Sequence, residues 1–195
     1  PSRGLGDVYK RQGGLSGMVM GSVSASVVSH ASCPVVVVRE DNHVTDSTKY
    51  GPVVVGVDGS EVSQKATAYA FREAQARGAA LIAVHTWMDM QVQASLAGLS
   101  AAQSEWADIE KEQSELLAEN LKEPREEYPD VEVKQLITRD RPVSALTEAA
   151  EGAQLLVVGS HGRGGFKGML LGSTSRALLQ SAPCPMMVVR PDEDN

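Results

Sequence analysis

The chain has 195 residues and a formal net charge of −7. This length suits one complete domain and part of another. The acidic balance argues against a nucleic-acid-binding protein, which normally presents a basic face. No apolar run approaches the ~20 residues of a membrane span, and no signal peptide is recognisable, so we expect no membrane partner and a cytoplasmic protein.

Two cysteines occur, Cys33 and Cys184, and each directly precedes a proline. Neither has neighbours at metal-ligand spacing, and a cytoplasmic chain rarely keeps disulfides. The pattern therefore favours free thiols, buried or half-buried, over a disulfide.

The beginning of the chain contains an internal repeat. Residues 1–12 show no periodicity and are interpreted as disordered or foreign sequence. Residues 13–39 repeat residues 164–190 at a constant offset of 151, with 13 of the 27 positions identical. A repeat of this size indicates duplication of a whole domain, of which 13–39 holds the final helix and strand. Polar residues 40–50 read as a linker.

Residues 51–191 contain a complete series of elements, and residues 192–195 form a tail. An apolar strand at 52–57 leads into a helix that Ser60 caps and Gly78 ends. The later elements follow in order: a strand at 80–87, a mobile stretch at 91–100, a helix at 101–126 limited by Pro124, a strand at 131–137, a helix at 142–151, a strand at 155–158, a helix reaching Gln180, and a last strand from Pro185 to Arg190.

This alternation predicts an α/β fold: a five-stranded parallel sheet, doubly wound, in a Rossmann-like three-layer sandwich. Ligands of such sheets bind beyond the carboxyl ends of the strands, where the strand order switches. Asp58, Thr86 and the loop after Val158 are all expected at that edge. Asp58 is favoured as a ligand contact, the alternative being a cap on the next helix. His85 is interpreted as structural.

The loop after residues 155–158 is rich in glycine and ends on the hydroxyls of Ser173, Thr174 and Ser175. Glycines let backbone N–H groups approach an anion, and a following helix offers unpaired donors at its positive end. The pattern favours a phosphate site over a simple tight crossover. His161 fits either ligand contact or loop packing. Two other nucleotide motifs, G-x-x-x-x-G-K-[ST] and G-x-G-x-x-G, are absent.

Several stretches together resemble the universal stress protein family: VVVGVDGS at 53–60, AVHTW at 83–87, VVGSHGRGGFKGMLLGSTS at 157–175 and CPMMVVR at 184–190. The resemblance covers 51–190, with the end of a preceding domain at 13–39. It implies the family's adenine nucleotide alpha-hydrolase-like fold, a tandem arrangement whose first domain is truncated, and binding of ATP, which the spacing of Gly159, Gly162, Gly172 and Ser173 fits. Val8 and Arg11 stand at the positions of Gly159 and Gly162 in the first copy, so a site there is incomplete.

The resemblance also assigns site residues. Gly56, Val57 and Asp58 would flank the ribose, with Asp58 the candidate ligand of a bound Mg²⁺, and Thr86 would meet the adenine. Val158, Gly159, His161, Gly162 and Arg163 would line the ribose and phosphates, and Gly172, Ser173, Thr174 and Ser175 would hold the terminal phosphates. One departure is Arg141 before Pro142, where the family often has glycine; Arg141 would reach solvent or ligand.

Three functions follow as hypotheses. The first is an ATP-binding stress-response module that senses or signals nucleotide state and is not an enzyme, since no general base or paired carboxylates are evident. The second is slow ATP hydrolysis or autophosphorylation on Ser173, Thr174 or Ser175. The third is an interaction module that dimerises through its last strand. The apolar strand at 35–38 is expected to compete for that edge, in the same chain or in another molecule.

Overall fold

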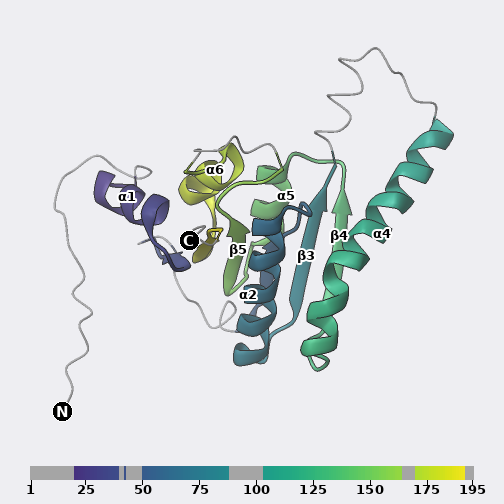
Figure 1. The fold of residues 1–195 in the computed structure, drawn as a ribbon, viewed down its shortest axis with the longest axis horizontal. Helices are drawn as coiled ribbons and strands as arrows, with labels where there is room; N and C mark the ends of the chain where they lie inside the picture. Colours follow the sequence, from purple (N-terminus) through teal and green to yellow (C-terminus); the bar gives the residue numbers. More distant parts are fainter. Residues whose placement is uncertain (1–19, 40–41, 43–49, 88–102, 164–169, 192–195) are drawn as a thin grey trace.

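The computed structural model describes residues 20–39, 42, 50–87, 103–163 and 170–191 (Figure 1). The segments expected to be foreign (1–12), mobile (91–100) and a tail (192–195) lie outside these ranges, as does most of the linker. The elements, in chain order, are α1 (Ser22–His30), β1 (Val35–Val37), β2 (Val53–Gly56), α2 (Glu61–Arg77), β3 (Leu81–Thr86), α4 (Gln103–Glu127), β4 (Val133–Thr138), α5 (Pro142–Ala149), β5 (Leu155–Gly159), α6 (Ser173–Ser181) and β6 (Met186–Val189).

The sheet has six strands in the order β1-β6-β5-β2-β3-β4. Strands β2 to β6 are parallel, as predicted, but β1 is antiparallel to β6, so the prediction of five parallel strands is wrong in number and direction. The physical reason is the open edge of β6, an apolar strand whose backbone groups need partners. The expected pairing of the early strand with the chain's own last strand is confirmed by the alignment of Val36 with Met187.

Helices cover both faces of the sheet (Figure 1). On one face, α2 and α4 pack Phe71 and Leu121 against Val53 and Val55. On the other, α5 and α6 form a second apolar cluster, which Val28 of α1 joins. Successive residues of β2 alternate between the two clusters, which is why the strand reads as an unbroken apolar run. Each large side chain that is fully buried contributes about 1.5–3 kcal/mol to folding.

The ends of α2 follow the predicted signals. The hydroxyl of Ser60 accepts a hydrogen bond from the Ser63 amide at 3.2 Å, and Gly78 takes the left-handed conformation at φ 60°. Helix α4 includes Pro124 and ends at Glu127, one residue beyond the predicted end at residue 126. The Tyr128 N–H donates to the Pro124 carbonyl at 2.9 Å, which completes the last helical turn after the proline. Within the described ranges, no helix is long and apolar enough to cross a membrane.

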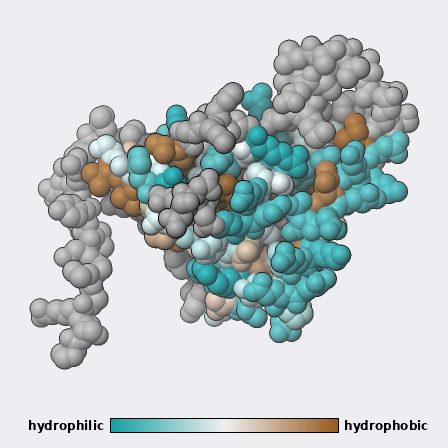
Figure 2. Space-filling model, viewed as in Figure 1, coloured by the Kyte–Doolittle hydropathy of each residue, from teal (hydrophilic) through white to brown (hydrophobic). Residues whose placement is uncertain are grey.

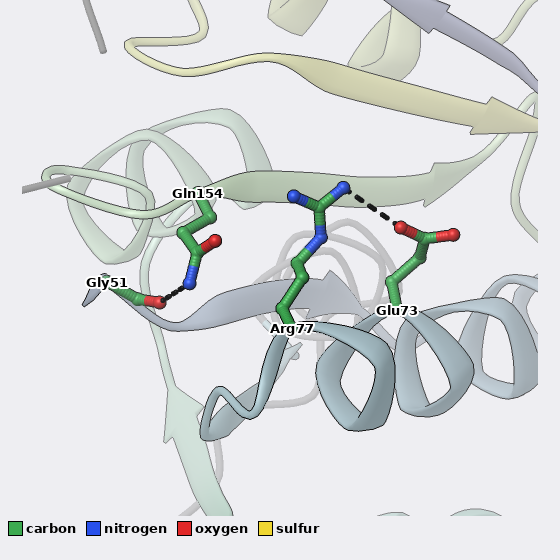
Figure 3. A network of polar contacts seen from close by, with 4 residues as sticks. All are labelled: Gly51, Glu73, Arg77 and Gln154. Carbon is green, nitrogen blue, oxygen red and sulfur yellow. Dashed lines mark hydrogen bonds and ion pairs between the residues drawn. The ribbon is translucent and has the colours of Figure 1, made fainter. Parts of the chain in front are cut away.

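The amino ends of β2 and β5 are held together by contacts around Gly51 (Figure 3). The Gln154 side chain donates to the Gly51 carbonyl at 2.7 Å, and the Gln154 amide donates to the Pro52 carbonyl at 2.9 Å. A Cβ on Gly51 would lie 1.9 Å from the carbonyl oxygen of Gly152, so this close approach requires glycine. Across the same view, Arg77 and Glu73 form an ion pair at 2.9 Å in the last turns of α2.

Both cysteines are free, as predicted. Cys184 is buried, and burial raises the pKa of its thiol to about 11. Cys33 is exposed, so the expectation of burial is wrong for this residue. It lies between α1 and β1.

Candidate functional site

The strand order switches direction between β2 and β5. From β2 the chain moves to β3 and β4 on one side, and it then crosses back to β5 and β6 on the other. The carboxyl ends of β2 and β5 therefore mark the switch point, which is the usual ligand position in such sheets. Asp58 follows β2, and residues 160–163 follow β5. The structure brings these two segments into direct contact.

Asp58 connects the two loops through its carboxylate. Its Oδ1 accepts hydrogen bonds from the Ser60 amide at 2.9 Å and the Ser60 hydroxyl at 2.7 Å. Its Oδ2 accepts from the Arg163 amide at 3.1 Å. The Asp58 amide donates to the Ser63 hydroxyl at 3.0 Å. Asp58 thus braces the start of α2, as the alternative interpretation expected, and it also ties down the loop after β5.

Gly162 and Gly59 permit this close approach. A Cβ on Gly162 would lie 2.2 Å from Asp58 Oδ2, closer than two such atoms can approach. Gly59 has φ +78°, which a side chain would strain, and the Arg163 guanidinium lies directly over it. Arg163 is exposed at this edge of the sheet.

The loop after β5 is fastened to the first turn of α6. The Gly172 amide donates to the Ser160 carbonyl at 2.7 Å, and the Ser160 amide donates to the Val189 carbonyl at 2.7 Å. The Ser175 hydroxyl donates to the Gly159 carbonyl at 2.6 Å. Ser160 is fully buried and was not among the predicted site residues; its position between two predicted glycines is the only sequence signal for it.

The first turn of α6 has no side-chain cap. Gly172 is the N-cap residue, and among the described residues the structure has no side-chain cap hydrogen bond at this end of the helix. Ser173 is exposed and Thr174 half-buried, whereas Ser175 is buried with its hydroxyl bonded to Gly159. The turn therefore offers open backbone donors and two accessible hydroxyls at the positive end of a helix, an arrangement that suits an anion.

Other predicted residues lie at or next to the carboxyl ends of the neighbouring strands. Thr86 ends β3 and is half-buried beside Thr138 of β4. Val57 and Val158 point into the two apolar clusters on opposite faces of the sheet, so only their backbones can face the edge. A Cβ on Gly56 would lie 3.2 Å from the Leu146 side chain.

Two histidines lie in this region. His85 is buried, with Nδ1 2.7 Å from the Val57 carbonyl and Nε2 3.0 Å from the Gln113 side-chain oxygen. It links β2, β3 and α4, which confirms the structural interpretation. His161 is half-buried, with Nδ1 3.1 Å from the Ser160 hydroxyl, so loop packing and ligand contact are both open to it.

Other predicted features are more peripheral. Arg141 is exposed at the N-cap of α5. Residues 164–169 of the glycine-rich loop lie outside the described residues. In the described part of the chain, no group of three or more histidine, cysteine, aspartate or glutamate residues is arranged to hold a metal ion.

Comparisons with known proteins identify relatives of both sequence and fold. The universal stress protein family model matches residues 8–39 and 49–190. Universal stress protein Rv2005c of Mycobacterium tuberculosis is 47% identical over 179 residues, which cover 92% of this chain and 59% of that protein. A universal stress protein from Archaeoglobus fulgidus has a TM-score of 0.58 at 25% identity, covering 90% of this chain and 56% of that one.

A third similar structure is a universal stress protein in complex with cAMP, with a TM-score of 0.50 at 27% identity; it covers 72% of this chain and 96% of that one. The chain spans a little under three-fifths of the length of the curated relative described above. The family model nevertheless accounts for most of its residues, in both repeats. The chain belongs to the universal stress protein family.

Proposed function

We propose that this protein binds one adenine nucleotide, ATP being the expected ligand, and that it acts in the cytoplasm as a nucleotide-dependent sensor or signalling module of a stress response. The observation that carries the proposal is the uncapped first turn of α6, held against the carboxyl end of β5 beside Asp58. Backbone donors at a helix N-terminus are a ready anion site. The similar structure in complex with cAMP supports an adenine nucleotide as the ligand.

Isothermal titration with ATP, with and without Mg²⁺, tests this proposal. We expect saturable heat with one nucleotide per chain and a rise in melting temperature, because a ligand that binds only the folded state stabilises it. The absence of both heat and a thermal shift at about 1 mM ATP would contradict the proposal. At that concentration a Kd of about 1 mM would be detected.

The repeat supplies a matched control. Gly172→Val places a branched side chain at the N-cap of α6, where a Cβ already comes within 3.2 Å of His161 Cα, and should abolish binding. Gly21→Val makes the same change at the corresponding position of the first repeat, where a Cβ would meet nothing within 4 Å. It should leave affinity and stoichiometry unchanged, because the first repeat lacks the complete loop.

We propose binding without fast chemistry. Phosphoryl transfer to a hydroxyl of α6 is the alternative, and it is favoured by the accessible positions of Ser173 and Thr174. Ser175 is a poorer acceptor, because its buried hydroxyl donates to Gly159. Intact-mass spectrometry after incubation with ATP separates the two ideas: a species heavier by about 80 Da, one added phosphoryl group, would establish autophosphorylation.

We also propose that residues 13–39 are the end of a first universal stress domain in a tandem protein. The family model's separate match to residues 8–39 supports this. So does the apolar surface over α1 (Figure 2), where Val27 is 50% exposed although its counterpart Leu178 is fully buried. Val38 is likewise 66% exposed and its counterpart Val189 1%. A longer chain that supplied the rest of that domain should bury both valines.

A further inference from the structure

The two repeats contact each other across a local two-fold axis. At the centre of the contact, Val36 pairs with Met187, which is its own counterpart at the offset of 151. The two flanking pairs are Val35 with Val188 and Val37 with Met186. Replacing each residue of one pair by its counterpart in the other repeat gives the other pair. The β1–β6 contact is therefore self-complementary: the same sequence positions meet from both sides.

Two arginine contacts obey the same symmetry. Arg39 Nη1 donates to the carbonyl of Gln180 in α6, and Arg190 Nη1 donates to the carbonyl of Ser29 in α1. Arg39 and Arg190 are counterparts at the offset of 151, and so are Ser29 and Gln180. Each repeat thus places its final arginine on the helix of the other repeat.

Both recipient carbonyls lie in the last turn of their helix, where the backbone has no partner within the helix. Neither helix ends in a left-handed glycine: the C-cap residues are Ala31, at φ −63° and ψ 137°, and Ala182, at φ −59° and ψ 130°. The last turn of α6 contains no basic residue, and in α1 the only one, His30, faces the Ser26 carbonyl. A cation is favourable at this negative end, so the opposite arginine supplies what each helix lacks.

We propose that Arg39 and Arg190 are positioning residues that fasten β1 to β6 by capping each other's helices. The edge formed by α6 and β6 accordingly fits one kind of partner: a copy of the same repeat, with an open helix end, a Cys-Pro turn and a strand ending in Val-Val-Arg. In this chain residues 20–39 occupy that place. The Arg190 contact is partly buried and the Arg39 contact exposed, so Arg190 contributes more.

Hydrogen exchange in the full chain tests the proposal. Arg190→Gln should raise the exchange rate of the β1 amides about tenfold, the size expected for a lost hydrogen bond from a charged donor. Arg39→Gln should have a smaller effect in the same direction, and the double variant should exceed both. Arg190→Lys, which keeps a positive charge near the helix end, should recover part of the protection. The exchange rates of the β2 amides should stay unchanged in all four variants.

Arg176→Gln is the matched control, since Arg176 is exposed at the other end of α6 and its replacement removes the same charge. It should leave β1 exchange within about twofold of the original protein, a change too small for a lost charged hydrogen bond. The proposal is wrong if both Arg190→Gln and Arg39→Gln leave β1 exchange unchanged. It is also wrong if Arg176→Gln matches Arg190→Gln, or if β2 exchange rises as much as β1 exchange.

Discussion

Asp58 shows how one side chain can serve both the fold and a ligand site. One carboxylate oxygen accepts both donors of Ser60 at the start of α2, and the other accepts the Arg163 amide, 105 positions away in the sequence. The second contact holds the loop after β5 against the loop after β2. If the proposed nucleotide binds here, it must accommodate or replace this contact, and we therefore propose that Asp58 couples the position of the loop to ligand binding.

Replacing Asp58 by asparagine tests this coupling. The amide oxygen can still accept from Ser60, but the amide nitrogen cannot accept from Arg163, so the loop after β5 loses its connection to β2. We expect ATP to bind about tenfold more weakly and unfolding to require about 1 kcal/mol less free energy. Titration calorimetry and urea unfolding measure the two effects. Unchanged ATP affinity together with lower stability would assign Asp58 a purely structural role.

The two thiols should differ sharply in reactivity. Burial raises the pKa of Cys184 from 9.0 to about 11, so at pH 8 its thiolate is about a hundredfold scarcer than in the unfolded chain. With a disulfide reagent at pH 8 we expect one fast thiol, the exposed Cys33, and a second only after unfolding. Two fast thiols in the folded protein would contradict this.

The same shift makes stability depend on pH. The folded state favours the neutral Cys184 thiol, and the pKa is raised, so this contribution to stability is fully present below about pH 9 and is lost as the pH rises toward about 11. Replacing Cys184 by alanine should remove this dependence. Urea midpoints measured between pH 8 and pH 11 would reveal the difference between the two proteins.

Among the helices and strands, the first turn of α6 carries three hydroxyls that lie in different environments. Ser175 holds the helix to β5 through the Gly159 carbonyl, while Thr174 is half-buried and Ser173 exposed near the open backbone donors. The resemblance to the family assigned all three to the phosphates. Their different burial implies that mutations in adjacent positions will separate stability from binding.

Alanine variants of the adjacent residues should separate these roles. Ser175→Ala leaves the Gly159 carbonyl without its side-chain donor and should cost about 1 kcal/mol, or about 2–4 °C in Tm for a protein of this size. Thr174→Ala removes no intramolecular hydrogen bond found in the structure, and it should lower ATP affinity with little change in Tm. The reverse pattern, with Thr174 affecting stability alone, would overturn this division.

At the scale of the whole molecule, the N-terminal fragment covers the edge of the sheet. Residues 20–39 pair with β6, add Val28 to the core and exchange helix caps with the last repeat. Without this cover, β6 would present unpaired backbone groups along an apolar strand. Such edges readily pair with other chains.

Deleting residues 1–39 should therefore produce a dimer that pairs through β6. Because the β1–β6 contact is self-complementary, a second copy can supply the same strand and the same arginine cap. Light scattering should give twice the mass of the monomer, in a concentration-dependent manner. A monomer with the Tm of the full chain would show that residues 1–39 contribute neither cover nor stability.

The order and type of the elements in the complete domain could be predicted from the sequence, because the signals for them are local. Apolar runs mark the buried strands, Ser60 and Gly78 mark the ends of α2, and the glycine spacing marks the loop after β5. The internal repeat also predicted that the early strand would pair with the last one. These patterns depend on near neighbours, so they can be read without coordinates.

Tertiary packing determines which distant residues meet. The Arg163 amide reaches Asp58 across 105 positions, and Arg190 reaches Ser29 across 161. The burial of the Ser175 hydroxyl against Gly159 and the antiparallel register of β1 on β6 are likewise visible only in the structure. Hydrogen bonds and burial between residues this far apart follow from how the layers pack, and no local pattern of residues encodes them.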